Sequence, residues 1–186
     1  MKDKSLSHIF KLSLYFFLRI ILICALSMMA STLALRAPIM NPILGIFYFL
    51  VLIYFVLLTF HHEGMSDRNR VETGLIRKNT AKGFISAGIV IVPMILAGAI
   101  PTIFMNGIEN VFTNVLNIIY LIFSLSVMNL AHTFVGDTQS KVIGFAVYAA
   151  VYAICFICAG IAYKFGFEDK HPFKKITDKF ASWKNS

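Results

Sequence analysis

The sequence has few charged residues and few prolines, cysteines and tryptophans. Charged residues make up 14% of the 186 residues, and the chain has five prolines, three cysteines and one tryptophan. A typical soluble domain carries about 25% charged and about 45–50% apolar residues, whereas apolar residues make up 58% of this chain. The mean hydropathy is +0.77. This composition argues against a soluble enzyme, a coiled coil or a disordered chain, and it indicates an integral membrane protein.

Recognisable catalytic motifs are missing as well. The sequence contains no P-loop, no G-x-S-x-G and no G-x-G-x-x-G before a helix. Cys24, Cys155 and Cys158 all lie within apolar runs, where cysteine behaves as a small hydrophobic residue. A structural zinc site needs four ligands, and the Cys155–Cys158 pair has no second pair to complete one. We therefore predict no enzymatic activity, no cofactor and no metal.

Acidic residues are absent from the apolar runs. Proton-coupled transporters usually need a relay of carboxylates or histidines deep within the membrane. The absence of acidic residues from the runs therefore argues against a pump or antiporter. Arg19 is the only charge well inside a run, about 10 Å beyond Leu12 at the helical rise per residue. We expect its side chain to snorkel to the surface or to make a structural hydrogen bond, rather than to bind a ligand.

Five apolar runs dominate the chain. A membrane span needs roughly 20 apolar residues, so the chain has room for a single multi-pass domain, 1–186, and no separate soluble domain. The first run has a basic start and a passable signal-peptide cleavage site at 32–34, but we interpret it as a retained span. The runs cover residues 12–34, 43–60, 83–105, 112–130 and 142–162.

The distribution of Lys and Arg indicates how many of the five runs cross the membrane. If all five cross, basic residues are almost evenly divided between the two sides. If the run at 112–130 does not cross, fourteen of the seventeen basic residues lie on the side of both termini and two, Arg36 and Lys141, lie on the other. The positive-inside rule favours the second arrangement. We predict an all-α helical bundle of four spans with both termini cytoplasmic, plus one interfacial or re-entrant apolar helix; five spanning helices are the alternative.

The run at 112–130 carries a polar stripe. Asn110, Asn114, Asn117 and Ser124 recur at helical spacing, which suits a helix in the interface or one dipping into the bundle. Together with Arg19, the asparagines Asn114 and Asn117 form a candidate intramembrane polar site, to which the helix containing Pro93 could contribute.

The last run and the segment after it carry two further patterns. Small residues at 146, 149, 150, 153 and 160 share one face, and small residues let helices pack closely in membranes. We expect this face to pack inside the bundle, with a partner protein as the alternative. The basic tail 163–186 predicts an amphipathic helix lying on anionic lipid, or binding a partner, with its apolar face formed by Phe173, Ile176, Phe180 and Trp183.

The polar segment 61–82 is predicted to be a structured cytoplasmic loop. Gly64 and Gly74 suit positive φ, Asp67 and Asn69 suit turns, and the basic residues suit inner-leaflet headgroups. The candidate interaction residues are Gly64, Asp67, Arg68, Asn69, Gly74, Arg77 and Lys78. The alternative is a connector that only fixes topology.

This segment also carries a resemblance. Its G-x-x-D-x-N-x-V-x-x-G-x-I pattern from Gly64 to Ile76, followed by Lys82-Gly83, resembles that of uncharacterised small multi-span membrane proteins of Gram-positive bacteria. The resemblance implies a bacterial cell membrane and supplies no activity and no catalytic residue.

Three functions remain open at this point. The first is a non-catalytic accessory or scaffold component that binds a membrane-protein partner. The second is a small transporter or the substrate-binding subunit of one, and the third is a membrane enzyme acting at the inner headgroups. The expected surroundings are a bilayer with anionic inner-leaflet lipids. Nucleic acid is not an expected partner, because the basic residues flank apolar runs.

Overall fold

The computed structural model describes residues 4–34, 40–104, 110–135 and 141–168. Within these ranges the chain forms helices and no strand, which confirms the predicted all-α class. The elements are α1 (Lys4–Ala34), α2 (Met40–Glu72), α3 (Lys82–Ala99), the π-helix η1 (Ile100–Phe104), α4 (Val111–Val135) and α5 (Lys141–Phe167).

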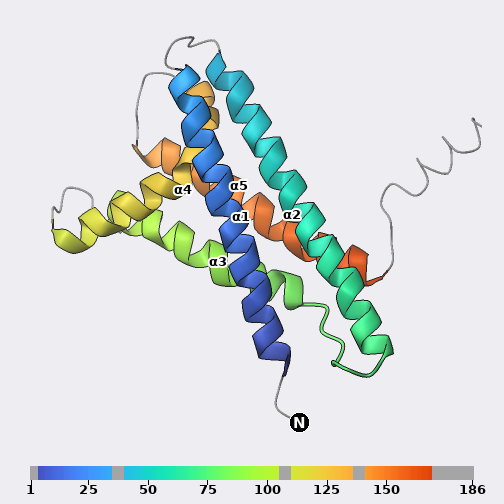
Figure 1. The fold of residues 1–186 in the computed structure, drawn as a ribbon. Helices are drawn as coiled ribbons and strands as arrows, with labels where there is room; N and C mark the ends of the chain where they lie inside the picture. Colours follow the sequence, from blue (N-terminus) through green and yellow to red (C-terminus); the bar gives the residue numbers. More distant parts are fainter. Residues whose placement is uncertain (1–3, 35–39, 105–109, 136–140, 169–186) are drawn as a thin grey trace, which may run out of the picture.

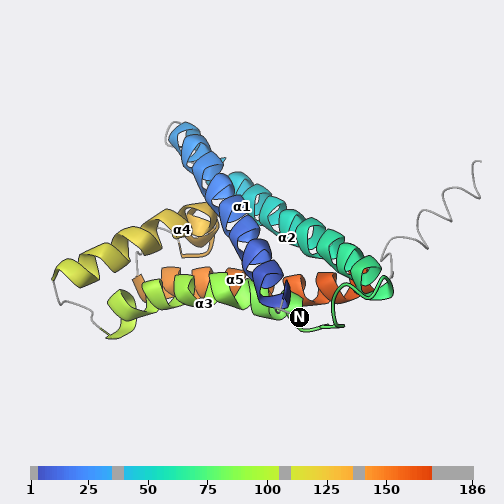
Figure 2. The same cartoon turned by 60° about the horizontal axis from the view of Figure 1, so that its bottom comes forward.

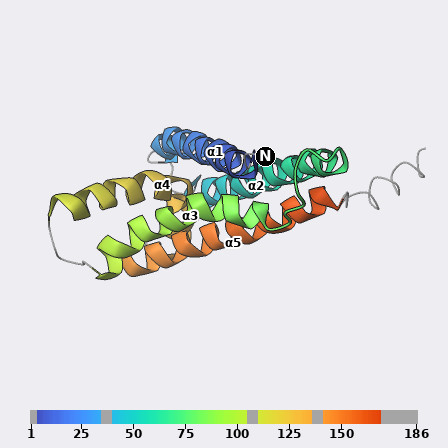
Figure 3. The same ribbon diagram turned by 90° about the horizontal axis from the view of Figure 1, so that it is seen from below.

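The helices pack as one bundle in two layers. α1 and α2 run side by side in opposite directions and cross over the pair formed by α3 and α5 (Figures 1 and 2). Seen from below, α3 and α5 lie alongside each other beneath α1 and α2 (Figure 3). α4 lies at the far end of the bundle and contacts all four of the other α-helices.

Four helices have the length and composition of membrane spans. They are Leu6–Met29, Pro42–Glu72, Lys82–Phe104 and Lys141–Phe167, and the segment Val111–Ser124 is a shorter apolar helix. This result confirms the predicted helical bundle with four helices able to span a membrane and one further apolar helix. Large apolar side chains cover much of the outer surface of the bundle, as expected where lipid replaces water.

The start of α1 and the end of α5 lie at the same end of the bundle. His8 of α1 lines a pocket there together with residues from the end of α2, the start of α3 and the end of α5. The four spans therefore begin or end together at this end, which we call the polar end. α4 packs against the other half, where its Phe123 contacts Phe17 and accepts a hydrogen bond from Tyr152.

The predicted loop 61–82 is in part wrong. α2 continues without a break to Glu72, so Gly64, Asp67 and Asn69 are helical rather than in turns. Among the described glycines only Gly74 has a positive φ, of 72°, and it turns the chain out of α2 toward α3. The reason for the longer helix is tertiary packing, because the last turns of α2 pack against the end of α5.

Candidate functional site

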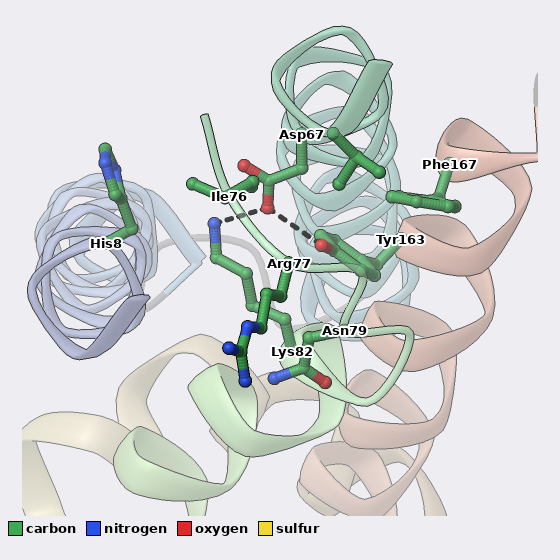
Figure 4. A pocket seen from close by; sticks show the side chains of 9 residues that line it. His8, Asp67, Ile76, Arg77, Asn79, Lys82, Tyr163 and Phe167 are labelled. Carbon is green, nitrogen blue, oxygen red and sulfur yellow. Dashed lines mark hydrogen bonds and ion pairs between the residues drawn. The ribbon is translucent and has the colours of Figure 1, made fainter. Parts of the chain in front are cut away.

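The polar end encloses a buried carboxylate, that of Asp67, which is 0% exposed. Its Oδ2 accepts hydrogen bonds from the Lys82 Nζ at 2.5 Å and from the Tyr163 hydroxyl at 2.8 Å. Its Oδ1 is 3.1 Å from Nη1 of Arg70. Both oxygens are thus occupied, as a buried charge requires. Asp67 thereby joins α2 to α3 and α5 (Figure 4).

A second acid completes this cluster. Glu63, one turn before Asp67 on α2, lies 3.0 Å from the Lys82 Nζ and 3.5 Å from Arg70. The side chain of Lys82 is itself 5% exposed, and its ammonium bridges both carboxylates. We call these five residues, two acids, two cations and one hydroxyl, the Asp67 cluster. Its formal charges sum to zero, so it is a satisfied network rather than an isolated charge.

Glycines allow the helices to approach closely enough to form the cluster. A Cβ at Gly64 would collide with the carbonyl oxygen of Tyr163, and a Cβ at Gly166 would collide with that of His61. α2 and α5 therefore touch backbone to backbone beside Asp67. On α3, a Cβ at Gly83 would meet the Tyr163 side chain, so the residue after Lys82 must also be small.

A small pocket opens beside the cluster. It has room for about one water molecule, which is too little for a substrate-sized molecule. Figure 4 shows Lys82 and Tyr163 pointing at the Asp67 carboxylate from two sides. The lining residues are His8, Asp67, Val71, Ile76, Arg77, Asn79, Lys82, Tyr163 and Phe167.

The seven predicted interaction residues divide into three groups by burial. Gly64 and Asp67 are buried in helix contacts, so they cannot meet a partner directly. Arg68 is half-buried and pairs with Glu72 at 2.8 Å. The other four, Asn69, Gly74, Arg77 and Lys78, are exposed.

The predicted intramembrane polar site is not assembled. Arg19 donates hydrogen bonds to Thr59 and to the Tyr15 hydroxyl, so the structural hydrogen bond expected for it is present. Asn114 and Asn117 are both exposed on α4, and Pro93 is exposed on α3. In the part of the chain that the structure describes, these three are not brought together with Arg19, because all three lie on outward-facing surfaces of their helices.

The small-residue face of α5 also departs from expectation. The sequence predicts that this face packs inside the bundle, but Ala146, Ala150 and Ala153 are exposed and Ala149 is half-buried. Only Gly160 is packed inside, where a Cβ would collide with the ring of Phe84. The tail residues Phe173, Ile176, Phe180 and Trp183 lie outside the described residues.

Four members of the Asp67 cluster were not predicted as site residues: Glu63, Arg70, Lys82 and Tyr163. A signal for the buried position of Asp67 is nevertheless present in the sequence. Leu52, Val56 and Phe60 recur every four residues and are buried, and Gly64 and Asp67 continue this stripe at helical spacing. Lys82, by contrast, could be paired with Asp67 only through the tertiary structure.

Chemically, the cluster is an arrangement of mutually engaged charges. The described residues contain no group of three or more His, Cys, Asp and Glu that could hold a metal ion. Both oxygens of Asp67 already accept hydrogen bonds from cations or from Tyr163. The arrangement is therefore suited to fixing the positions of α2, α3 and α5 relative to one another.

The comparisons with known proteins leave the family open. No family model, no curated protein and no solved structure matches this chain.

Proposed function

We propose that the protein is a non-catalytic accessory or scaffold component of a membrane complex, and that it binds a transmembrane helix of a partner protein. The observation that carries this proposal is the outer face of α5. Ala146, Ala150 and Ala153 are spaced by four and three residues and are exposed. In lipid, small residues at such spacing let a second helix approach closely and gain van der Waals contact.

The rest of the bundle supports a docking role over transport. Among the described residues, apolar and aromatic side chains pack together in the core, and the pocket at the polar end admits about one water molecule. The asparagines that would have formed a substrate site face outward. A pocket joining His61, Asp67 and Glu72 would favour a membrane enzyme, but neither His61 nor Glu72 lines the pocket that contains Asp67.

We propose that the protein lies in a bacterial cell membrane with the polar end in the cytoplasm. The support is the positive-inside rule, because Lys11, Arg77 and Lys78 are exposed near this end. A membrane-impermeant maleimide should label Lys78→Cys only after the cells are opened. Labelling in intact cells would reverse the proposed orientation.

The docking proposal is tested by adding bulk to the face. Tagged protein is purified in mild detergent with a photo-crosslinking residue at Ala146, and its adducts are identified by mass spectrometry. We expect a stoichiometric adduct with one membrane protein, lost in Ala150→Leu. The matched control is Ala25→Leu, because Ala25 is an exposed alanine on α1.

Two outcomes would overturn the proposal. One is a monodisperse protein that forms no adduct at position 146. The other is an adduct that both leucine variants reduce equally, because bulk at Ala25 cannot affect a helix seated on α5.

A further inference from the structure

The pocket at the polar end lies at the level where the spans end. Its lining includes His8, two residues into the first candidate span, Lys82, the first residue of the third, and Phe167, the last of the fourth. In a bilayer, the ends of apolar spans lie at the headgroups. If the spans cross a bilayer, the molecules nearest to this pocket are therefore lipid headgroups, which carry the phosphates.

The charge around the pocket is positive. Within the Asp67 cluster, Lys82 and Arg70 balance Glu63 and Asp67. Nearby, Glu72 is paired with Arg68 and Glu168 lies 4.0 Å from Lys164. Arg77 has no carboxylate within ion-pair distance in the part of the chain that the structure describes, so it is surplus positive charge.

Arg77 is also well placed to bind an anion. Figure 4 shows its guanidinium on the side of Lys82 that faces away from the Asp67 carboxylate. His8 of α1 and Asn79 line the same pocket. The neighbouring helix α3 begins without a side-chain cap, so the partial positive charge of its first turn adds to that of Arg77.

We propose that this pocket binds the phosphate of an anionic phospholipid, with Arg77 as the principal ligand. A guanidinium binds phosphate oxygens through two parallel hydrogen bonds, and His8 and Asn79 add further donors. Because the pocket admits about one water molecule, one phosphate oxygen enters it while the headgroup stays at the mouth. That geometry suits a lipid whose acyl chains remain along the outer surface of the bundle.

The test is lipid binding to the full-length protein in detergent micelles, measured by native mass spectrometry. We expect phosphatidylglycerol to bind more tightly than phosphatidylcholine, and Arg77→Gln to weaken phosphatidylglycerol binding about tenfold. Arg77→Lys keeps the charge but loses the paired N–H donors of the guanidinium. It should therefore weaken phosphatidylglycerol binding less than Arg77→Gln does. The matched control is Arg68→Gln, which removes the same charge from a residue outside the pocket and should change binding less than twofold.

The outcomes separate a site from general attraction. Equal losses in Arg77→Gln and Arg68→Gln would show that only net charge matters, and would overturn the proposal. Displacement of phosphatidylglycerol by an equal concentration of inorganic phosphate would show a site for free phosphate, and would overturn the assignment to lipid. Neither result bears on the α5 face, so this inference stands or falls separately from the proposed docking.

Discussion

The two halves of the bundle hold their helices together by different interactions. At the polar end, Asp67 is fully buried and binds cations or a hydroxyl from three helices. In the half that contacts α4, buried aromatic residues pack together, and Tyr148 and Tyr152 donate to backbone carbonyls of Met94 and Phe123. The buried charges of the polar end depend on every partner being present. The aromatic packing of the other half loses only part of its contacts when one group is removed. The polar end should therefore be far more sensitive to single substitutions.

The largest effect is expected at Asp67. Asp67→Asn leaves the buried ammonium of Lys82 without its full counter-charge, and breaking a buried pair in this way typically costs about 3–5 kcal/mol. The control Glu72→Gln acts on a pair at the surface, where the cost is about 0–1 kcal/mol. Thermal unfolding of the purified variants in detergent measures both.

A double variant sharpens this comparison. Asp67→Asn combined with Lys82→Met removes both members of the central pair, so it should be more stable than Asp67→Asn alone. Similar stabilities of Asp67→Asn and Glu72→Gln would contradict the view that burial makes the cluster critical.

The next largest effect is expected at the glycine contacts of the same end. Gly166→Ala places a Cβ against the backbone carbonyl of His61, which cannot move without separating α2 from α5, and overpacking of this kind costs about 1–3 kcal/mol. Gly144→Ala is the control in the same helix, because a Cβ there meets nothing within 4 Å. It should stabilise the helix by about 0.5–1 kcal/mol. Shifts of the same sign in both variants' melting temperatures would argue against the close α2–α5 contact.

The smallest effect is expected in the half that contacts α4. Tyr152→Phe removes the hydroxyl that donates to the carbonyl of Phe123 but keeps the buried ring. The free energy of unfolding should therefore fall by about 1 kcal/mol. The control Tyr54→Phe acts on an exposed ring and should be close to neutral. The same unfolding assay compares the two, and a loss in Tyr152→Phe as large as that in Asp67→Asn would remove the distinction between the halves.

Much of the fold could be predicted from the sequence. The low charge, the long apolar runs and the asymmetric Lys and Arg distribution predicted four spanning helices plus one further apolar helix. The structure has four helices long and apolar enough to span a membrane, plus one further apolar helix. Composition and hydropathy are sufficient for this because a bilayer leaves helical spans as the simplest way to satisfy the backbone. The structural hydrogen bond of Arg19 followed from the same reasoning.

The Asp67 cluster, the exposure of Ala146, Ala150 and Ala153, and the length of α2 were decided by the tertiary structure. Local residue preferences at Gly64, Asp67 and Asn69 favour turns, and packing against α5 outweighs them. Lys82 and Tyr163 lie 15 and 96 residues from Asp67, and no local pattern links residues so far apart. An apolar sequence likewise does not determine which face of a helix packs against another helix and which faces lipid. Both environments accept the same side chains.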